Sequence, residues 1–325
     1  MAEKKVIIVG AGPCGMSAAI ELQDRGIDPL ILEKGNIVDT IYRYPTHQTF
    51  FSSSEKLEIG NVAFITAKTK PQRLDALAYY REVAKRHKLR IHAFETVNGI
   101  VRTGKEFVIH AEKAGHGPKE YQAAQVILAS GYYGQPNYMN IPGEQLAKVS
   151  HYFKEAHPFY QKRVAVVGGK NSAVDAALEL YKAGAEVTVL YRGSAYSPSI
   201  KPWILPEFDS LIQKGEIAMV FHADLKAIAE DEIIYEVKGK QHRIENDFVF
   251  AMTGYHPDHE LLKNAGVDID QATGAPVHDQ QTFETNVNGL YIAGVIAAGY
   301  NNNSIFIENG RFHGGAIAES IIKKS

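Results

Sequence analysis

Residues 6–15 read VIIVGAGPCG, a short run of β-branched residues that ends in a glycine-rich loop. The loop has the pattern Gly10-x-Gly12-x-x-Gly15, and small and apolar residues of helical character follow it. In a strand–loop–helix unit the first glycine permits a tight turn and the second lets a pyrophosphate approach the backbone. The third lets the helix pack closely against the strand. The stretch therefore predicts a βαβ unit that binds a dinucleotide.

A second strand is predicted at Leu30–Leu32, and Glu33 stands at its end, 18 residues after Gly15. A carboxylate at this place accepts hydrogen bonds from the hydroxyl groups of a ribose. We therefore expect Glu33 to bind the cofactor of this unit, together with Pro13, Cys14 and Lys34.

The sequence repeats this unit 158 residues later. VGAGPCGMSAAIEL begins at Val9 and VGGKNSAVDAALEL begins at Val167, so Gly10 pairs with Gly168. A second strand follows the repeat at Val187–Leu190. The duplication predicts an α/β fold with two Rossmann-like dinucleotide-binding domains.

The second copy departs from the first at the positions that select the ligand. Lys170 replaces the middle glycine, Glu33 maps onto Tyr191, and Arg192 follows. A carboxylate repels a 2′-phosphate, whereas a guanidinium pairs with it, so this copy predicts NADPH rather than NADH. Arg192 as a solvated charge at a strand end is the alternative, and Lys201 is a second candidate for the phosphate. The predicted cofactor contacts here are Gly168, Gly169, Lys170, Asn171, Ser172 and Arg192.

The rest of the chain predicts further elements. We expect a helix over 73–87, strands near 91–97, 106–111 and 121–129, and a linker at Pro136, Pro142 and Gly143. After the second copy we expect strands near 217–221, 232–237 and 289–299, and a terminal helix over 304–323.

The composition narrows the class of protein. The chain has 325 residues and a net charge of −2, with no basic block of the kind that binds nucleic acid. It has no apolar run long enough to span a membrane and no signal-peptide pattern after Met1, so we expect a cytoplasmic location. Cys14 is the single cysteine, which excludes an internal disulfide and a CxxC redox pair.

Five segments carry a family resemblance: GAGPCG, ILASG, GGKNSA, AMTGYHPD and YIAGV. Their order resembles that of the flavoprotein reductases with two dinucleotide-binding domains, of the thioredoxin reductase type. The resemblance implies an FAD-binding domain over 1–140 and 256–325, interrupted by an NADPH-binding domain over 141–255. It places further cofactor contacts at Tyr42, Gln48, Val97, Gly131, Gly294, Val295 and Ile305.

Two departures separate the chain from thioredoxin reductases themselves. It lacks their CxxC pair, and Gly294-Val295 stands where they have Gly-Asp. The segments GPCG, YPTHQTFFSSSEKLEIG, YRGSAYSPSIKPWILPEF and IFIENGRFHGG are similar to those of the YpdA-type bacillithiol disulfide reductases. This resemblance implies FAD, NADPH as hydride donor, and bacillithiol disulfide as substrate.

Cys14 allows two interpretations. A thiol at a helix N-terminus gains thiolate character, and the family resemblance implies that this cysteine is the redox residue. Alternatively, Cys14 is a small side chain on a buried helix face, because Cys14, Ala18 and Leu22 are spaced four residues apart.

Several further side chains are candidates for the flavin or the substrate. Thr46, Gln48, Tyr132 and Tyr133 lie in loops that allow contact with a ring system, and the alternative for each is ordinary packing. Arg311 and His313 allow contact with a substrate carboxylate, with an ordinary helix surface as the alternative. The histidines around Asp258 do not form a convincing metal site.

Three other functions stay open on the sequence alone. They are a ferredoxin–NADP reductase of the thioredoxin reductase type, a flavin monooxygenase, and a redox-sensing flavoprotein without turnover. We expect a homo-oligomer, most simply a homodimer.

Overall fold

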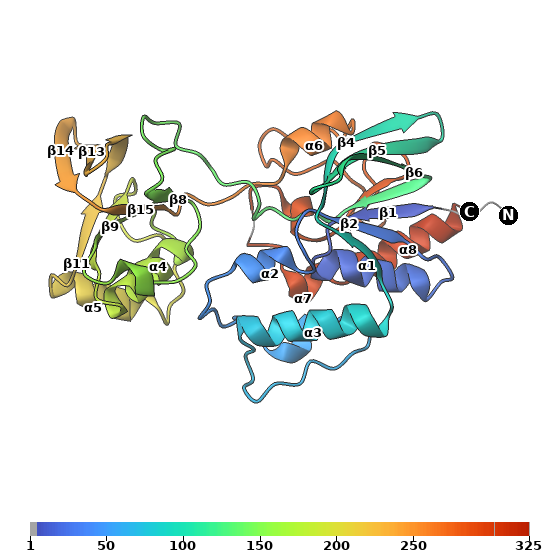
Figure 1. Ribbon diagram of the computed structural model, residues 1–325, viewed down its shortest axis with the longest axis horizontal. Helices are drawn as coiled ribbons and strands as arrows, with labels where there is room; N and C mark the ends of the chain where they lie inside the picture. Colours follow the sequence, from blue (N-terminus) through green and yellow to red (C-terminus); the bar gives the residue numbers. More distant parts are fainter. Residues whose placement is uncertain (1–4, 302, 325) are drawn as a thin grey trace. The chain divides into compact units, whose positions relative to one another are not determined.

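The computed structural model describes residues 5–301 and 303–324. The chain forms two compact units (Figure 1). The first unit comprises the residues up to Arg43, His47–Gln135, and the residues from Tyr255 onward; the second comprises Tyr44–Thr46 and Pro136–Gly254. The first unit is therefore built from segments far apart in the sequence, and the second is almost continuous.

A five-stranded parallel sheet forms the centre of the first unit, in the order β16–β7–β1–β2–β3. All four residues of β1 are buried, which explains its run of β-branched residues. The bounds are β1 Val6–Val9, β2 Leu30–Glu33, β3 Arg90–Ala93, β7 Gln125–Leu128 and β16 Leu290–Ile292. A three-stranded antiparallel sheet accompanies it: β4 Glu95–Thr103, β5 Glu106–Lys113 and β6 Gly117–Ala123.

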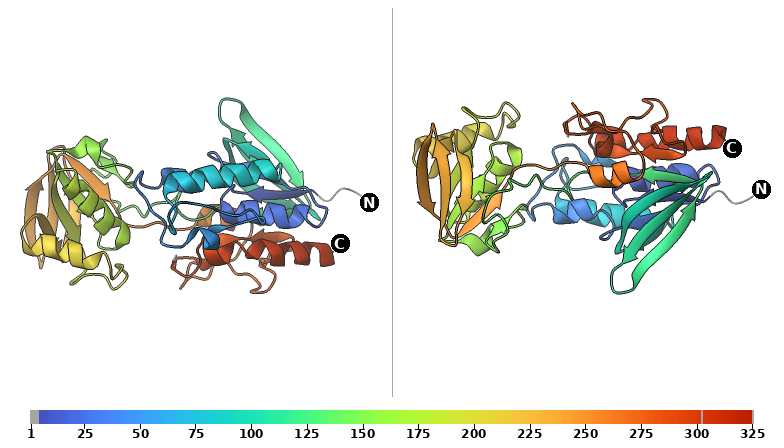
Figure 2. Two further views of the ribbon diagram at one scale, coloured as in Figure 1. Left: turned by 90° about the horizontal axis from the view of Figure 1, so that it is seen from below. Right: turned by 90° about the horizontal axis from the view of Figure 1, so that it is seen from above.

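Two helices from opposite ends of the chain, α1 (Pro13–Gln23) and α8 (His313–Lys323), lie side by side (Figure 2). Their backbones approach closely, because a Cβ added at Gly314 would lie only 2.5 Å from the Cα of Ala18. The other helices of this unit are α2 Asp39–Arg43, α3 Arg73–Arg86, α6 His259–Asn264 and α7 Ile307–Gly310, with the 3₁₀ helices η1 Ser54–Leu57 and η3 Gly294–Ala298.

The second unit repeats this plan. Its parallel sheet has the order β11–β10–β9–β15–β8, and an antiparallel sheet of β12, β13 and β14 accompanies it. The strands are β8 Val149–Ser150, β9 Arg163–Val167, β10 Glu186–Tyr191, β11 Ile217–Phe221, β12 Asp224–Ile228, β13 Glu232–Val237, β14 Lys240–Glu245 and β15 Phe248–Ala251. The helices are η2 His157–Phe159, α4 Asn171–Lys182 and α5 Leu205–Gln213.

The predicted α/β class with two Rossmann-like units is confirmed, and several predicted elements are wrong in detail. The strand predicted over 289–299 ends at Ile292, because Gly294 has φ +79° and η3 begins there. The helix predicted over 304–323 is two helices, because the carbonyl of Arg311 accepts a hydrogen bond from Ser17 Oγ at 2.7 Å.

Two other predicted strands are each divided in two. The strand near 91–97 is broken at Phe94, which has φ +60°, and the strand near 121–129 is broken at Ala124. The predicted linker is also wrong in detail, because Pro136, Pro142 and Gly143 all belong to the second unit, where the Pro142 carbonyl accepts from Ile228 N at 2.9 Å. Within the described residues, no helix is both long and apolar enough to cross a membrane.

Candidate dinucleotide sites

The glycine loop of the first unit joins β1 to α1. At two positions of this loop, Gly10 and Gly15, only glycine fits. Gly10 has φ +109°, and its amide donates to the Leu32 carbonyl at 2.8 Å. A Cβ added at Gly10 would lie 2.5 Å from the carbonyl oxygen of Ala129, and one added at Gly15 would overlap the carbonyl oxygen of Gly10. Both glycines are therefore required by the packing of the loop itself.

Gly12 has a different role, since it is the N-cap of α1 with φ −75° and a Cβ added there would meet nothing within 4 Å. Gly131, which follows β7, likewise faces open space. Ser130 has its backbone nitrogen 3.3 Å from a Cβ added at Gly10, and its Oγ is buried and has no hydrogen-bond partner within 5–301 and 303–324. Open space at a helix N-terminus beside an orphaned hydroxyl fits the pyrophosphate of a dinucleotide.

Glu33 closes this loop from the end of β2. It is 6% exposed, and its two carboxylate oxygens accept from Ala11 N at 2.7 Å and from Gly35 N at 2.8 Å. Burial raises the pKa of Glu33, and the hydrogen bonds from Gly35 and Ala11 oppose that rise. Each oxygen keeps a second lone pair, so the carboxylate still has the capacity to bind a ribose hydroxyl. The neighbouring Lys34 extends its ammonium group to Gly134.

Cys14 lies on the first turn of α1 and contacts two glycines from the other end of the chain. A Cβ added at Gly294 would lie 2.9 Å from the Cys14 sulfur, and one at Gly310 would lie 3.0 Å from it. Burial raises the pKa of the Cys14 thiol to about 12, and the negative charge of Glu308 adds to the effect. This direction is opposite to the thiolate-stabilising effect of the helix N-terminus.

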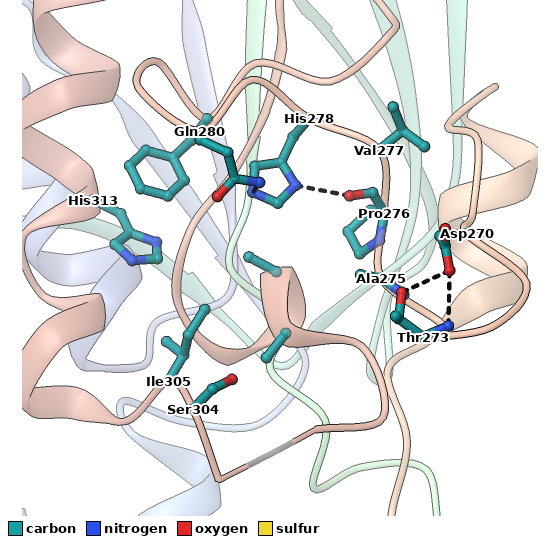
Figure 3. A pocket seen from close by; sticks show the side chains of 13 residues that line it. Asp270, Thr273, Ala275, Pro276, Val277, His278, Gln280, Ser304, Ile305 and His313 are labelled. Atoms are coloured by element: carbon teal, nitrogen blue, oxygen red, sulfur yellow. Dashed lines mark hydrogen bonds between the residues drawn. The ribbon is translucent and has the colours of Figure 1, made fainter.

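The first unit holds a cavity of about 540 Å³ (Figure 3). Its lining includes Gln280, His278 and His313 together with the apolar side chains of Pro276 and Ile305. The predicted contact at Ile305 is therefore on the wall of this cavity.

His313 connects this cavity to the loop around Cys14. Its Nδ1 accepts a hydrogen bond from Gly294 N at 3.2 Å, and its ring stacks on Phe283 with 3.9 Å between the ring centroids. Burial lowers the pKa of His313 to about 4, and the nearby His278 contributes. His313 is therefore neutral at physiological pH, and it is not the helix-surface residue that was the alternative.

We expect this buried imidazole to make stability depend on pH. The unfolded chain binds a proton at His313 below pH 6.5, whereas the folded chain binds it only near pH 4, so stability is lost as the pH falls through this window. The loss is at most about 1.4 kcal/mol per pH unit. Urea unfolding of the wild type and of His313→Gln, whose amide oxygen can replace Nδ1, measures the difference. Equal slopes in the two proteins would contradict the prediction.

The other predicted residues of the first unit lie in several places. Tyr42 is half-exposed, and the Arg73 guanidinium lies 5.3 Å from the centre of its ring. Gln48 donates to the Thr49 carbonyl at 2.7 Å. Val97 lies on β4 and packs against the hydrophobic core that includes Val9 and Leu32. Val295 follows Gly294 in η3.

The loop candidates with an aromatic or hydroxyl side chain are placed as follows. Tyr133 packs on Tyr255 with 4.5 Å between the ring centroids, and Tyr132 packs on the same ring at 6.3 Å. Thr46 belongs to the second unit, where its amide donates to the Lys154 carbonyl at 2.9 Å.

Arg311 is not among the residues that line the cavity. Its Nη1 donates to the carbonyls of Glu55 and Glu58, which ties the end of α7 to the segment around η1. Sequence reasoning treated this residue as a candidate for a substrate carboxylate, and the structure gives it a packing role within the first unit.

The glycine loop of the second unit has the same arrangement at its first glycine as the loop of the first unit. Gly168 has φ +144°, and its amide donates to the Leu190 carbonyl at 3.0 Å. A Cβ added there would lie 2.5 Å from the carbonyl oxygen of Met252, just as Gly10 meets Ala129. The duplication read from the sequence therefore extends to the backbone geometry.

The predicted polar residues of this loop divide by exposure. Lys170 is the N-cap of α4, and both Lys170 and Ser172 are exposed. The Asn171 side chain donates to the Ser199 carbonyl at 2.8 Å and accepts from Lys201 N at 2.9 Å. Asn171 thus fastens the segment that carries Lys201 to the start of α4. No sequence signal indicated this role, because its partners are 28 and 30 residues away.

Arg192 follows the last residue of β10 and is exposed. Strand ends and helix N-termini meet at one edge of a parallel sheet, so Arg192 and the start of α4 lie on the same edge of this sheet. The Lys201 ammonium lies 5.9 Å from the centre of the Trp203 ring. The segments next to the loop that lacks a ribose-binding carboxylate thus carry the cations Arg192 and Lys201.

A metal centre finds no support in the described ranges, where no three His, Cys, Asp or Glu side chains cluster suitably. Asp258 instead caps α6 by accepting from Leu261 N at 3.0 Å, and His259 contacts the Gly274 carbonyl at 2.8 Å.

The family model for pyridine nucleotide-disulphide oxidoreductases matches residues 7–294. The chain belongs to this family. Its members are oxidoreductases that use FAD and a pyridine nucleotide. Two glycine loops, one served by Glu33 and the other by Arg192, agree with two different nucleotide cofactors.

Similar proteins extend over the full length of this oxidoreductase. The chain is 60% identical over 326 residues to the bacilliredoxin reductase Bdr of Bacillus subtilis, covering 100% of this chain and 99% of that protein. Its structure resembles the bacillithiol disulfide reductase Bdr (YpdA) of Bacillus cereus, with a TM-score of 0.97, 59% identity and 99% of both chains covered. The corresponding protein of Staphylococcus aureus gives a TM-score of 0.94 and 54% identity, covering 100% of both chains. The predicted family is confirmed.

Proposed function

We propose that this chain is an FAD-dependent enzyme that uses NADPH to reduce the disulfide of a low-molecular-weight thiol, namely bacillithiol disulfide. The observation that carries the proposal is the pair of glycine loops with one backbone geometry and opposite charge beside the ribose position. A resident FAD and a diffusible NADPH need these two kinds of site. The similarity to proteins named bacillithiol disulfide reductase supports the choice of substrate.

The residues of the first unit would hold the resident cofactor. The amides at the start of α1 and the Ser130 hydroxyl would bind the pyrophosphate, and Glu33 would bind the ribose. FAD, when bound, supplies a ring that takes a hydride from NADPH and passes two electrons to a disulfide. The overall reaction consumes one proton and converts the disulfide and NADPH into two thiols and NADP⁺.

Cys14 is the proposed redox residue for a covalent route, in which its sulfur forms a mixed disulfide with one bacillithiol while the other leaves as the thiol. The route requires the thiol to lose a proton at a position where burial opposes that loss. Direct reduction of the substrate by the flavin is the alternative, in which Cys14 only fills the space between Gly294 and Gly310.

The proposal includes the location and the oligomeric state of the enzyme. A single thiol and no disulfide suit a reducing cytoplasm, and we propose a homodimer as the active form.

Anaerobic NADPH oxidation tests the function. We expect oxidation that depends on bacillithiol disulfide, and a much slower rate with ferredoxin or with no acceptor. Oxidised glutathione is the matched control for a small disulfide without the malate group. Consumption only with ferredoxin would overturn the proposal. The same assay on Cys14→Ala, with its flavin content measured, separates the two routes: unchanged turnover excludes the mixed disulfide.

A further inference from the structure

The cavity of about 540 Å³ in the first unit has a volume typical of pockets that hold a small organic molecule. His313, the first residue of α8, lines it, and so does Gln280 from the segment between α6 and β16 (Figure 3). Neither side chain belongs to the glycine loops to which the two cofactors are assigned. The polar groups of the cavity are therefore additional to those of the proposed cofactor sites.

His313 presents a hydrogen-bond donor at the cavity. It is 8% exposed, and burial lowers its pKa to about 4, so the ring is neutral at physiological pH. Its Nδ1 accepts from Gly294 N at 3.2 Å, which places the hydrogen of the neutral ring on Nε2. Nε2 has no hydrogen-bond partner within the described part of the chain. A buried N–H of this kind needs an acceptor from a ligand or from water.

Phe283 holds the imidazole of His313 in this orientation. The two rings stack with 3.9 Å between their centroids and 16° between their planes. Phe283 has φ +57°, which is unfavourable for a bulky side chain. Its backbone is held on both sides, because its amide donates to the Asp279 carbonyl at 2.9 Å and its carbonyl accepts from Ile292 N at 3.0 Å. The Nε2 donor is therefore preorganised for a ligand.

Gln280 adds a hydrogen-bond acceptor. His278 Nδ1 donates to the Pro276 carbonyl at 2.7 Å, so Nε2 of the neutral ring is an acceptor. Gln280 Nε2 lies 3.3 Å from it and serves as the donor. The Gln280 amide oxygen has no partner within residues 5–301 and 303–324. The cavity thus offers a donor at His313 and an acceptor at Gln280, which together suit a ligand with amide and hydroxyl groups.

The lining of the cavity disfavours an anionic ligand. No Lys or Arg is among the described residues that line it. Asp270 does line it, and hydrogen bonds from the Thr273 amide and hydroxyl, each 2.8 Å long, lower the pKa of its carboxyl group. This carboxylate is therefore negative at neutral pH and repels phosphate and carboxylate groups. A neutral polar molecule is the class of ligand that fits.

We infer that the cavity binds the amide-linked amino sugar of one half of the disulfide substrate, with His313 Nε2 donating to an oxygen of that group and Gln280 Oε1 accepting from one of its hydroxyl groups. The inference rests on the proposed function. Bacillithiol is cysteine joined by an amide to glucosamine, which carries malate through a glycosidic bond. The malate belongs outside the cavity, because the lining offers its carboxylates no cation. His313 therefore has a neutral partner in place of the substrate carboxylate expected from the sequence.

Binding of methyl N-acetylglucosaminide to the FAD-loaded protein tests the site without turnover. This glycoside keeps the amide and the hydroxyl groups and lacks the thiol and the malate. We expect saturable binding with a Kd on the order of 1 mM and a shift of the nitrogen NMR signal of His313 Nε2, whereas malate alone should leave that signal unchanged. Because the protein carries its FAD, a cavity filled by the flavin would bind no glycoside. An unchanged His313 signal, or an equal shift with malate, would overturn the inference.

Two substitutions in the cavity and one beside it show whether the glycoside occupies this place. Gln280→Leu removes the acceptor and Ala298→Leu fills part of the volume, and we expect each to weaken binding by about tenfold or more. Gln281→Leu is the matched control, because Gln281 is exposed and only its backbone amide donates to Asp279, at 2.9 Å. It should bind the glycoside as the wild type does. Equal affinity in the wild type and all three variants would overturn the inference.

Turnover separates this inference from the proposed function. Gln280→Leu and Ala298→Leu should each raise the KM for bacillithiol disulfide by about tenfold and leave the KM for NADPH unchanged. An unchanged KM for the disulfide in both active variants would overturn the inference and leave the proposed function standing. A wild type that binds the glycoside but does not oxidise NADPH with bacillithiol disulfide would instead overturn the proposed function and leave a glycoside site.

Discussion

Gly12→Ala is expected to weaken FAD binding by about 100-fold or more, which corresponds to roughly 3 kcal/mol. The added Cβ meets no protein atom within 4 Å, and it enters the space that the pyrophosphate needs at the start of α1. Because φ at Gly12 is −75°, alanine fits the backbone without strain. The flavin absorbance of the purified protein and titration of the apoprotein with FAD measure the effect, while urea unfolding of the apoprotein should be unchanged.

Gly15→Ala is the matched control, three residues further along the same loop. Its Cβ would overlap the Gly10 carbonyl, so we expect this variant to lower the stability of the apoprotein by about 1–3 kcal/mol. The two variants therefore separate a glycine required by the ligand from one required by the fold. Normal FAD binding by Gly12→Ala would show that the open space at Gly12 is not the pyrophosphate site.

Alkylation of Cys14 by iodoacetamide at neutral pH is expected to be about a thousandfold slower in the folded protein than in the unfolded one. The expectation follows from the pKa of about 12, which leaves almost all of the thiol protonated at neutral pH. The rate should rise as the pH approaches 12. Because the chain has one cysteine, the mass increase measured over time reports this sulfur alone.

The duplication supplies a matched control for this measurement. Ser172 is the counterpart of Cys14 on α4 and is exposed. The double variant Cys14→Ser with Ser172→Cys moves the only thiol to the same helical position in the other unit, where we expect the rate of a free thiol. Fast alkylation of the folded wild type would mean that Cys14 is accessible and would favour the covalent route.

The sequence predicted those residues of the site whose arrangement follows from their spacing within one short segment. Gly10, Gly12, Gly15 and Glu33 lie within one strand–loop–helix–strand unit, so their spacing fixes their arrangement. The contact of Cys14 with Gly294 and Gly310 joins residues about 300 positions apart, and no local pattern indicates it.

The interrupted helix at the end of the chain illustrates the same limit. Residues 304–323 have a helical composition. The interruption occurs where the Ser17 hydroxyl donates a hydrogen bond to the Arg311 carbonyl. Such tertiary hydrogen bonds decide where an element ends, and they become visible only when distant segments are in place.

The first unit takes its edge strand β16 and the helix α8 from the last part of the chain, whereas the second unit is almost continuous. During synthesis the inserted unit therefore has all its strands before β16 and α8 emerge, and it can fold while its host still lacks them. The packing around the first glycine loop is therefore complete only late, because Gly294 and Gly310, which lie against Cys14, are among the last residues to be made.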